Sequence, residues 1–152
     1  MYKIESQKQL SFENFYLPFG GSLNPRNRWI QLSKLIPWEE FEETYAKQFS
    51  EEGMGAPAKS FRMALGALLI KEKLRITDEE TVQQIRENHY LQYLIGMEGY
   101  QDEELFDPSM MVYFRRRITM EMLCEINERV HEEQVKKNNK IIRRLKKKKK
   151  LL

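Results

Sequence analysis

The most constraining feature of the sequence is the segment FRMALGALLIKEKL at residues 61–74, which is apolar on nearly every side of a helix. At helical spacing, its apolar side chains form two stripes. One stripe consists of Phe61, Ala64, Leu65, Leu68 and Leu69, and the other of Met63, Ala67, Ile70 and Leu74. A helix of this kind needs neighbours on most of its sides. We therefore predict that it lies in the middle of a helical bundle.

Prolines and a threonine indicate where other helices begin. Pro37 suits the first position of a helix over about residues 37–49, and Pro57 suits the start of the central helix. Pro108 likewise begins a late helix, which can start again at Thr119 and continue past residue 130.

A capping box and a glycine mark two short helices after the central one. Thr77 and Glu80 have the spacing of a capping box, which predicts a helix over residues 78–89. The helical run at residues 90–95 ends at Gly96, because glycine readily adopts the left-handed conformation that stops a helix.

No segment alternates with period two, so we predict an all-α fold, a compact bundle of five to six helices. Before it comes an irregular aromatic N-terminal arm over residues 1–28, in which prolines and glycines break regular structure. The aromatic residues expected to pack are Phe12, Phe15, Tyr16 and Phe19. We assign the helical domain to residues 29–135 and a basic tail, either a frayed helix or disordered, to residues 136–152.

The net charge of +3 hides an uneven distribution. Residues 136–152 hold ten of the 26 Lys and Arg residues and no acidic residue, so residues 1–135 carry a net charge of −7. A lysine run can neutralise phosphates without sequence preference. It can equally lie against its own acidic body. The overall charge therefore does not identify a nucleic-acid binder, because attraction to phosphate depends on the local potential.

Few residues suit a metal site or a catalytic group. Cys124, His89 and His131 are too few for a structural zinc site, and a lone cysteine fits a reducing compartment. The carboxylates Asp102, Glu103, Glu104 and Asp107 lie in one polar segment, which favours a solvated loop over a Mg²⁺ site. We expect no metal, no cofactor and no membrane span, and a cytoplasmic protein.

Three consecutive arginines, Arg115, Arg116 and Arg117, are the main candidate site. On a helix they fan over about 200°, so at most two can address one surface. Because two short helical runs precede them, the three helices are compatible with a helix-turn-helix arrangement whose last helix enters the major groove. A solvated arginine cluster that pairs with the acidic body remains an open alternative.

About residues 11–135 also resemble a known protein family. The matching parts, in order, are a Pro-Trp helix, an apolar helix followed by a T-D-x-E capped helix, an aromatic run ending at Gly96, and FDPSMMVYFRRRI. The last stretch matches the family pattern at Asp107, Ser109, Phe114, Arg115 and Arg117. Together these features resemble the N-terminal domain of InsH-like, DDE-type bacterial insertion-sequence transposases.

The resemblance implies DNA recognition by residues 59–117. In that family the N-terminal helical domain is thought to bind the terminal inverted repeats of the element, and an RNase H-like domain then cuts and rejoins DNA with two metal ions. The residues expected to contact DNA are Ser109, Tyr113, Arg115, Arg116, Arg117, Lys59 and Arg62, of which Ser109, Arg115 and Arg117 match best. The implied partners are DNA at transposon ends and, among proteins, a second copy or a full-length transposase.

The tail lies where the family would continue toward its catalytic sheet. Because Lys and Asn codons are A-rich and A runs favour slippage, we predict a truncated transposase or the first product of a split frame. Such a chain lacks the catalytic domain and is not an enzyme. Sequencing the coding DNA past the stop codon tests this hypothesis. The rival interpretation is a helical interaction module that dimerises and binds no specific DNA.

Overall fold

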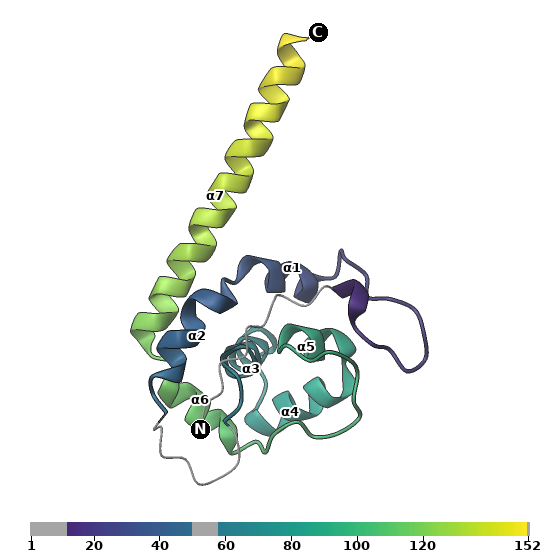
Figure 1. Cartoon of the computed structure of the whole chain (residues 1–152), viewed down its shortest axis with the longest axis vertical. Helices are drawn as coiled ribbons and strands as arrows, with labels where there is room; N and C mark the ends of the chain where they lie inside the picture. The colour runs from purple at the N-terminus through teal and green to yellow at the C-terminus, as the bar shows by residue number, and fades with distance from the viewer. Residues whose placement is uncertain (1–11, 50–57, 152) are drawn as a thin grey trace.

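Seven α-helices form the regular structure in a computed structural model that describes residues 12–49 and 58–151 (Figure 1). A short 3-10 helix, η1 (Phe12–Asn14), precedes them. The helices are α1 (Arg28–Leu35), α2 (Trp38–Ala46), α3 (Phe61–Leu74), α4 (Asp78–Glu87), α5 (His89–Leu94), α6 (Met110–Arg117) and α7 (Met120–Lys150). No strand forms within these ranges, which confirms the all-α prediction, although there are seven helices instead of the five or six expected.

The additional helix is α1. Asn27 caps it by accepting a hydrogen bond from the backbone N–H of Trp29, whose side chain is buried. Ile36 then adopts an extended conformation, as a residue before proline usually does, and this separates α1 from α2. Pro37 is the residue before α2 and not, as predicted, its first helical residue.

Helix α3 occupies the centre of the bundle, where it packs against α2, α4, α5 and α6 (Figure 1). Its Phe61, Leu65 and Ile70 are at most 1% exposed. A Cβ added at Gly66 would lie 2.9 Å from Cγ2 of Ile95, so glycine lets α3 and the end of α5 approach closely. The prediction of a central helix is confirmed.

The capping side chains set several helix ends as predicted. Thr77 and Thr119 each accept, through Oγ1, a hydrogen bond from the backbone N–H three residues on, at 3.1 and 3.2 Å. Gly96 has a φ of 90°, which is the left-handed conformation expected at the end of a helix. The predicted start of the central helix at Pro57 is wrong: Pro57 itself lies outside the described residues, but α3 begins at Phe61, and the side chain of Ser60 caps it by accepting a hydrogen bond from the backbone N–H of Met63.

The predicted helix-turn-helix arrangement is not what the structure shows. Helices α4 and α5 meet at Asn88, but α5 ends at Leu94 and α6 begins only at Met110. A helix-turn-helix joins its helices by about three or four residues. Helix α6, which contains the three arginines, packs mainly against α3, the central helix of the bundle.

The N-terminal arm packs against α5 and the loop that follows it. Phe15 is 5% exposed, and its ring meets that of Tyr93 edge-on with 6.0 Å between centroids. Tyr16 pairs with Gly99 as an isolated parallel bridge. The side chains of Tyr16 and Phe19 nevertheless remain 65% and 70% exposed, so the expected packing holds for only part of the aromatic arm.

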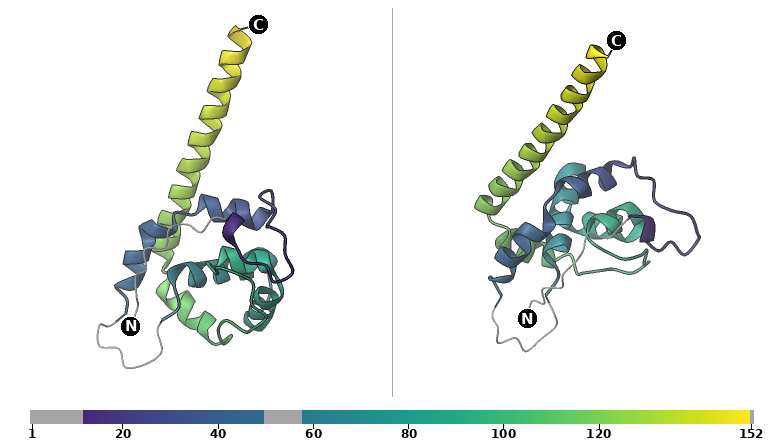
Figure 2. Two further views of the ribbon diagram at one scale, coloured as in Figure 1. Left: turned by 45° about the vertical axis from the view of Figure 1, so that its right-hand side comes forward. Right: turned by 45° about the horizontal axis from the view of Figure 1, so that its top comes forward.

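Helix α7 leaves the body as a long single helix (Figure 2). Met122 and Ile126 on its first turns are buried, and Nε of Arg129 lies 3.3 Å from Oε2 of Glu40 in α2. All described residues from 131 onward are exposed. The tail is helical to residue 150, where we expected a frayed or disordered end. Lysines near a helix C-terminus oppose its negative end, which favours this conformation. The domain boundaries stay predictions.

Candidate nucleic-acid interface

Asp107 and Ser109 fix the start of α6, the helix that carries the three arginines. Oδ1 of Asp107 accepts a hydrogen bond from the backbone N–H of Ser109 at 2.8 Å. Hydrogen bonds from the side chain and backbone of Ser109 hold the pKa of Asp107 below its usual value. The ionised carboxylate opposes the positive end of the helix, which favours this start.

Helix α6 has one buried side and one exposed side. Met111 and Phe114 are fully buried, and the ring of Phe114 contacts Phe106 at 5.2 Å between centroids. Residues on the opposite side recur at i, i+3, i+4 and i+7, so they lie along one face of the helix. We call this set the outward face of α6; it consists of Ser109, Val112, Tyr113 and Arg116, all exposed.

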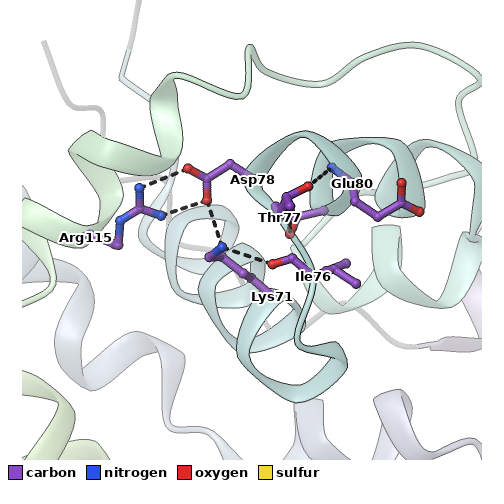
Figure 3. Close-up of polar contacts among 7 residues, drawn as sticks. Lys71, Ile76, Thr77, Asp78, Glu80 and Arg115 are labelled. Carbon is purple, nitrogen blue, oxygen red and sulfur yellow. Dashed lines mark hydrogen bonds and ion pairs between the residues drawn. The ribbon is translucent and has the colours of Figure 1, made fainter.

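Arg115 lies at one edge of the outward face, where Asp78 of α4 holds it (Figure 3). Its Nη1 and Nη2 donate to Oδ1 and Oδ2 of Asp78 at 2.8 and 3.0 Å. Nζ of Lys71 lies 3.3 Å from the same Oδ1 and donates to the carbonyl of Ile76 at 3.0 Å. The hydrogen bonds from Arg115 and then Lys71 lower the pKa of Asp78. This network joins α3, α4 and α6 and fixes the orientation of α6.

Arg117 lies at the other edge, where it stacks on aromatic rings. Its guanidinium carbon is 4.2 Å from the ring centroid of Phe49 and 5.7 Å from that of Tyr113. Its backbone carbonyl accepts a hydrogen bond from the side chain of Gln48. Burial raises the pKa of Tyr45, and a hydrogen bond from Arg117 opposes that increase. Arg117 is therefore a structural contact between α6 and the end of α2 as well as a surface charge.

Arg116 is the remaining arginine of α6, and it is exposed. Its guanidinium carbon lies 5.9 Å from the ring centroid of Tyr113 on the same face. Within residues 12–49 and 58–151 it forms no ion pair. From the family resemblance we expected Ser109, Arg115 and Arg117 to be the best DNA-contacting residues. In the structure, the residues on the same face as Ser109 are Arg116 and Tyr113. Counting helical positions from Ser109 would have shown this grouping and would also have added Val112, which the sequence analysis missed.

The two candidates outside α6 do not lie on its outward face. Lys59 is half-buried, directly before the Ser60 cap of α3. Arg62 is only 4% exposed and donates hydrogen bonds to the carbonyls of Tyr93 and Leu94. The prediction that Arg62 contacts DNA does not fit this burial, because its donors are used inside the fold.

The Asp78 network gives a testable effect on stability. Replacing Asp78 with asparagine should lower the free energy of unfolding at pH 7 by no more than about 1 kcal/mol, because Arg115 is partly exposed. The folded state lowers the pKa of Asp78. The stabilisation is therefore present above the unfolded pKa of about 3.9 and is lost as the pH falls through the folded value.

Urea unfolding of the wild type and Asp78→Asn at pH 7 and at successively lower pH measures this effect. The difference between the two proteins should shrink below pH of about 4. Glu79→Gln, at an exposed neighbouring position, is the matched control and should change little. A difference that stays constant down to pH of about 2 would contradict the assigned role of the carboxylate.

The carboxylate loop contains Asp102, Glu103, Glu104 and Asp107. Asp102 pairs with Arg86 at 3.1 Å. Among the described residues, no group of three or more His, Cys, Asp or Glu side chains is placed to hold a metal ion. None of the described helices combines the length and apolar character that a bilayer span requires.

Comparison with known proteins identifies the family. A family model described as Transposase domain (DUF772) matches residues 19–117. An uncharacterized protein, ORF8 in the nfe locus of Rhizobium meliloti, is 34% identical over 104 residues, which cover 68% of this chain and 49% of that protein. The chain thus spans about half the length of this curated relative. No solved structure matches the chain. The matched residues include every helix from α1 to α6, and the chain belongs to the DUF772 transposase domain family, the family of the InsH N-terminal domain.

Proposed function

We propose that the chain binds DNA at the terminal inverted repeats of a transposable element through the outward face of α6. One observation carries the proposal: a helix with a fully buried side presents Ser109, Val112, Tyr113 and Arg116 together to solvent. The transposase family supports DNA as the partner.

The side chains of the outward face have the chemistry that base and phosphate contacts require. The guanidinium of Arg116 can donate two hydrogen bonds to O6 and N7 of a guanine in the major groove. The methyl groups of Val112 suit contact with a thymine methyl, and the hydroxyls of Ser109 and Tyr113 can donate to phosphate. Base contacts by Arg116 and Val112 would give sequence preference, and the hydroxyl contacts would fix the position of the helix.

Arg115 and Arg117, at the two edges of the outward face, fix the orientation of α6 for DNA binding. Arg115 is anchored to Asp78, and Arg117 is stacked on Phe49, so both keep a positive charge beside the face without needing to move. A recognition helix held by its neighbours loses less conformational freedom on binding than a mobile one. The acidic body also limits non-specific attraction to phosphate, so binding should depend on contacts made at this face.

Replacing Arg116 with alanine tests the proposal. Loss of a bidentate base contact is worth about 1–3 kcal/mol, which corresponds to a decrease in affinity of about fivefold to 150-fold. Fluorescence anisotropy should compare a duplex of the terminal repeat, taken from the DNA that flanks the coding sequence, with a shuffled duplex. Arg116→Ala should weaken binding to the repeat and reduce the preference over the shuffled duplex, and Arg116 is exposed enough for the fold to remain unchanged.

Arg143→Ala is the matched control, since Arg143 is an exposed arginine on the basic part of α7. It should weaken binding to both duplexes equally, as loss of a phosphate contact does. The proposal would be contradicted if the wild type bound repeat and shuffled DNA equally. It would also be contradicted if the Arg116→Ala protein kept the wild-type preference for the repeat.

An alternative function has support from a different observation. Val135, Ile141, Ile142 and Leu145 of α7 are all more than 40% exposed, which is typical of a helix that binds another protein. In this alternative the chain is a helical interaction module without specific DNA binding. The shuffled-duplex comparison separates the two functions, because the module should show no preference for the repeat.

A further inference from the structure

We infer that two copies of this chain associate through the projecting part of α7, with the two helices antiparallel. Val135, Ile142 and Leu145 are 41%, 48% and 55% exposed, and every described residue of α7 from 131 onward is exposed. Exposed apolar side chains at regular helical spacing are the usual contact surface between two helices. This inference does not depend on DNA binding, because α6 is not part of the surface.

Val135 and Ile142 lie on the side of α7 opposite the core-facing Ile126, whereas the exposed Ile141 lies about 60° from Ile126. Ile126 faces the core, and each further residue turns the helix by about 100°. Val135 and Ile142 therefore lie about 180° and 160° from Ile126, and Leu145 lies about 100° from it. A second helix can run along this side without meeting α1 or α2, which contact the other side of α7 (Figure 2).

Three basic residues of α7 lie on the side opposite Val135 and Ile142. By the same count, Lys137, Lys140 and Arg144 fall within about 40° of the direction of Ile126. Their charges would stay in solvent when two helices meet along the apolar side. Over residues 137–144 the sequence thus separates these three charged side chains from the side of Val135 and Ile142.

The spacing of the contact side fits a coiled-coil register. Val135, Asn138, Ile142 and Leu145 are separated by three, four and three residues, as successive a and d positions are. In an antiparallel pair centred at residue 140, Val135 faces Leu145 of the second copy and Asn138 faces Ile142. Each of these apolar residues then packs against one of the same four residues of the second copy. We call these four residues the α7 contact stripe.

The charges of α7 decide the direction of the pair. Residues 120–135 contain five glutamates and one arginine, and residues 136–151 contain ten lysines and arginines without an acid. A parallel pair would bring the two lysine runs at residues 146–150 together, which like-charge repulsion opposes. An antiparallel pair places each run beside the glutamate-rich half of the other copy. Glu132 then lies next to Lys146 of the second copy at both ends.

Single-cysteine variants of the full chain test the direction directly. In a Cys124→Ser background, which removes the exposed native thiol, Val135→Cys and Leu145→Cys are prepared separately and then mixed under mild oxidation. The mixture should form a disulfide-linked heterodimer, and neither variant should link to itself. In the antiparallel pair, two copies of residue 135 are separated by about 15 Å along the axis, which is too far for a disulfide.

Two outcomes would overturn the inference. Self-linked Val135→Cys would show a parallel pair. If no sample forms a disulfide link and light scattering gives a monomer mass at the same concentration, α7 does not associate. If the monomer binds DNA through the basic residues of α7, then α7 is a DNA contact and not a dimer contact. Light scattering of a Val135→Asp, Ile142→Asp double variant, whose changes are solvent-exposed, should in contrast give only monomer.

A charge exchange provides an independent check with matched partners. Glu132→Lys places like charges at both ends of the pair, and so does Lys146→Glu, so each protein alone should associate several-fold more weakly than the wild type. An equimolar mixture of the two should restore association, because each end then regains opposite charges. A mixture no stronger than either protein alone would contradict the antiparallel arrangement.

Discussion

Replacing Arg62 with alanine should lower the free energy of unfolding by about 3–5 kcal/mol. The guanidinium of Arg62 donates from Nε to the carbonyl of Leu94 and from Nη2 to that of Tyr93, both at 2.9 Å, and from Nη2 to Oγ of Ser33 at 3.2 Å. Its guanidinium carbon also lies 5.0 Å from the ring centroid of Trp38. Truncation would leave buried carbonyls at the end of α5 without donors and open a cavity between α1, α3 and α5.

Urea unfolding measures the effect, with Arg62→Lys and Arg86→Ala as comparisons. Lysine keeps a charge but not the planar fork, so it should lose a large part of the stability, about 2 kcal/mol or more. Arg86 is only partly buried and pairs with Asp102, so its truncation should cost less than about 1 kcal/mol. An Arg62→Ala protein within about 1 kcal/mol of the wild type would mean that these hydrogen bonds do not hold α5 in place.

Gln92 is expected to have the second largest effect. Its side chain is fully buried, and Nε2 donates to the carbonyls of Ile85, Arg86 and Gln101 at 3.1, 3.1 and 2.8 Å. Oε1 accepts a hydrogen bond from the backbone N–H of Gln101 at 2.9 Å. Replacement with leucine keeps the approximate volume but leaves these buried groups unpaired, at a cost of about 2–4 kcal/mol.

Gln83→Leu is the matched control for Gln92→Leu. Gln83 is exposed on α4, where its side-chain amide donates a hydrogen bond to Oε1 of the nearby Glu87, so the same substitution there should change stability by less than about 0.5 kcal/mol. Hydrogen exchange should also show that Gln92→Leu loosens the loop over residues 97–107 before the rest of the fold. Equal stability of the two variants would contradict the role assigned to Gln92.

The local signals in the sequence predicted the helices well. The segment at residues 61–74 is apolar nearly all round, and this composition requires neighbours on all sides, so its central position followed from the sequence. The caps at Thr77 and Thr119 and the stop at Gly96 depend on contacts within a few residues, which a linear pattern contains. Helix α1 was missed as a separate element because its cap at Asn27 lies directly after the irregular arm.

The arrangement of the candidate site could be predicted only in part. Helical spacing placed Met111 and Phe114 toward the core, but Arg115 pairs with Asp78, which is 37 positions away, and no local pattern indicates that partner. Arg62 looked like a surface charge because arginine is usually exposed. Its burial depends on contacts with the end of α5, about thirty residues later in the sequence. Only the folded structure could therefore show that Arg62 belongs to the core and not to the candidate DNA-binding face.

The most direct test of DNA binding by the outward face of α6 is an NMR titration of the ¹⁵N-labelled chain with the terminal-repeat duplex at moderate salt. We expect the largest amide shift changes on Ser109 and α6, and only weak changes, on the basic part of α7, with a shuffled duplex. The Arg116→Ala protein should lose the α6 changes and keep the others. Changes confined to residues 136–151 with both duplexes would contradict the central claim, because the lysine-rich end alone would then bind the DNA.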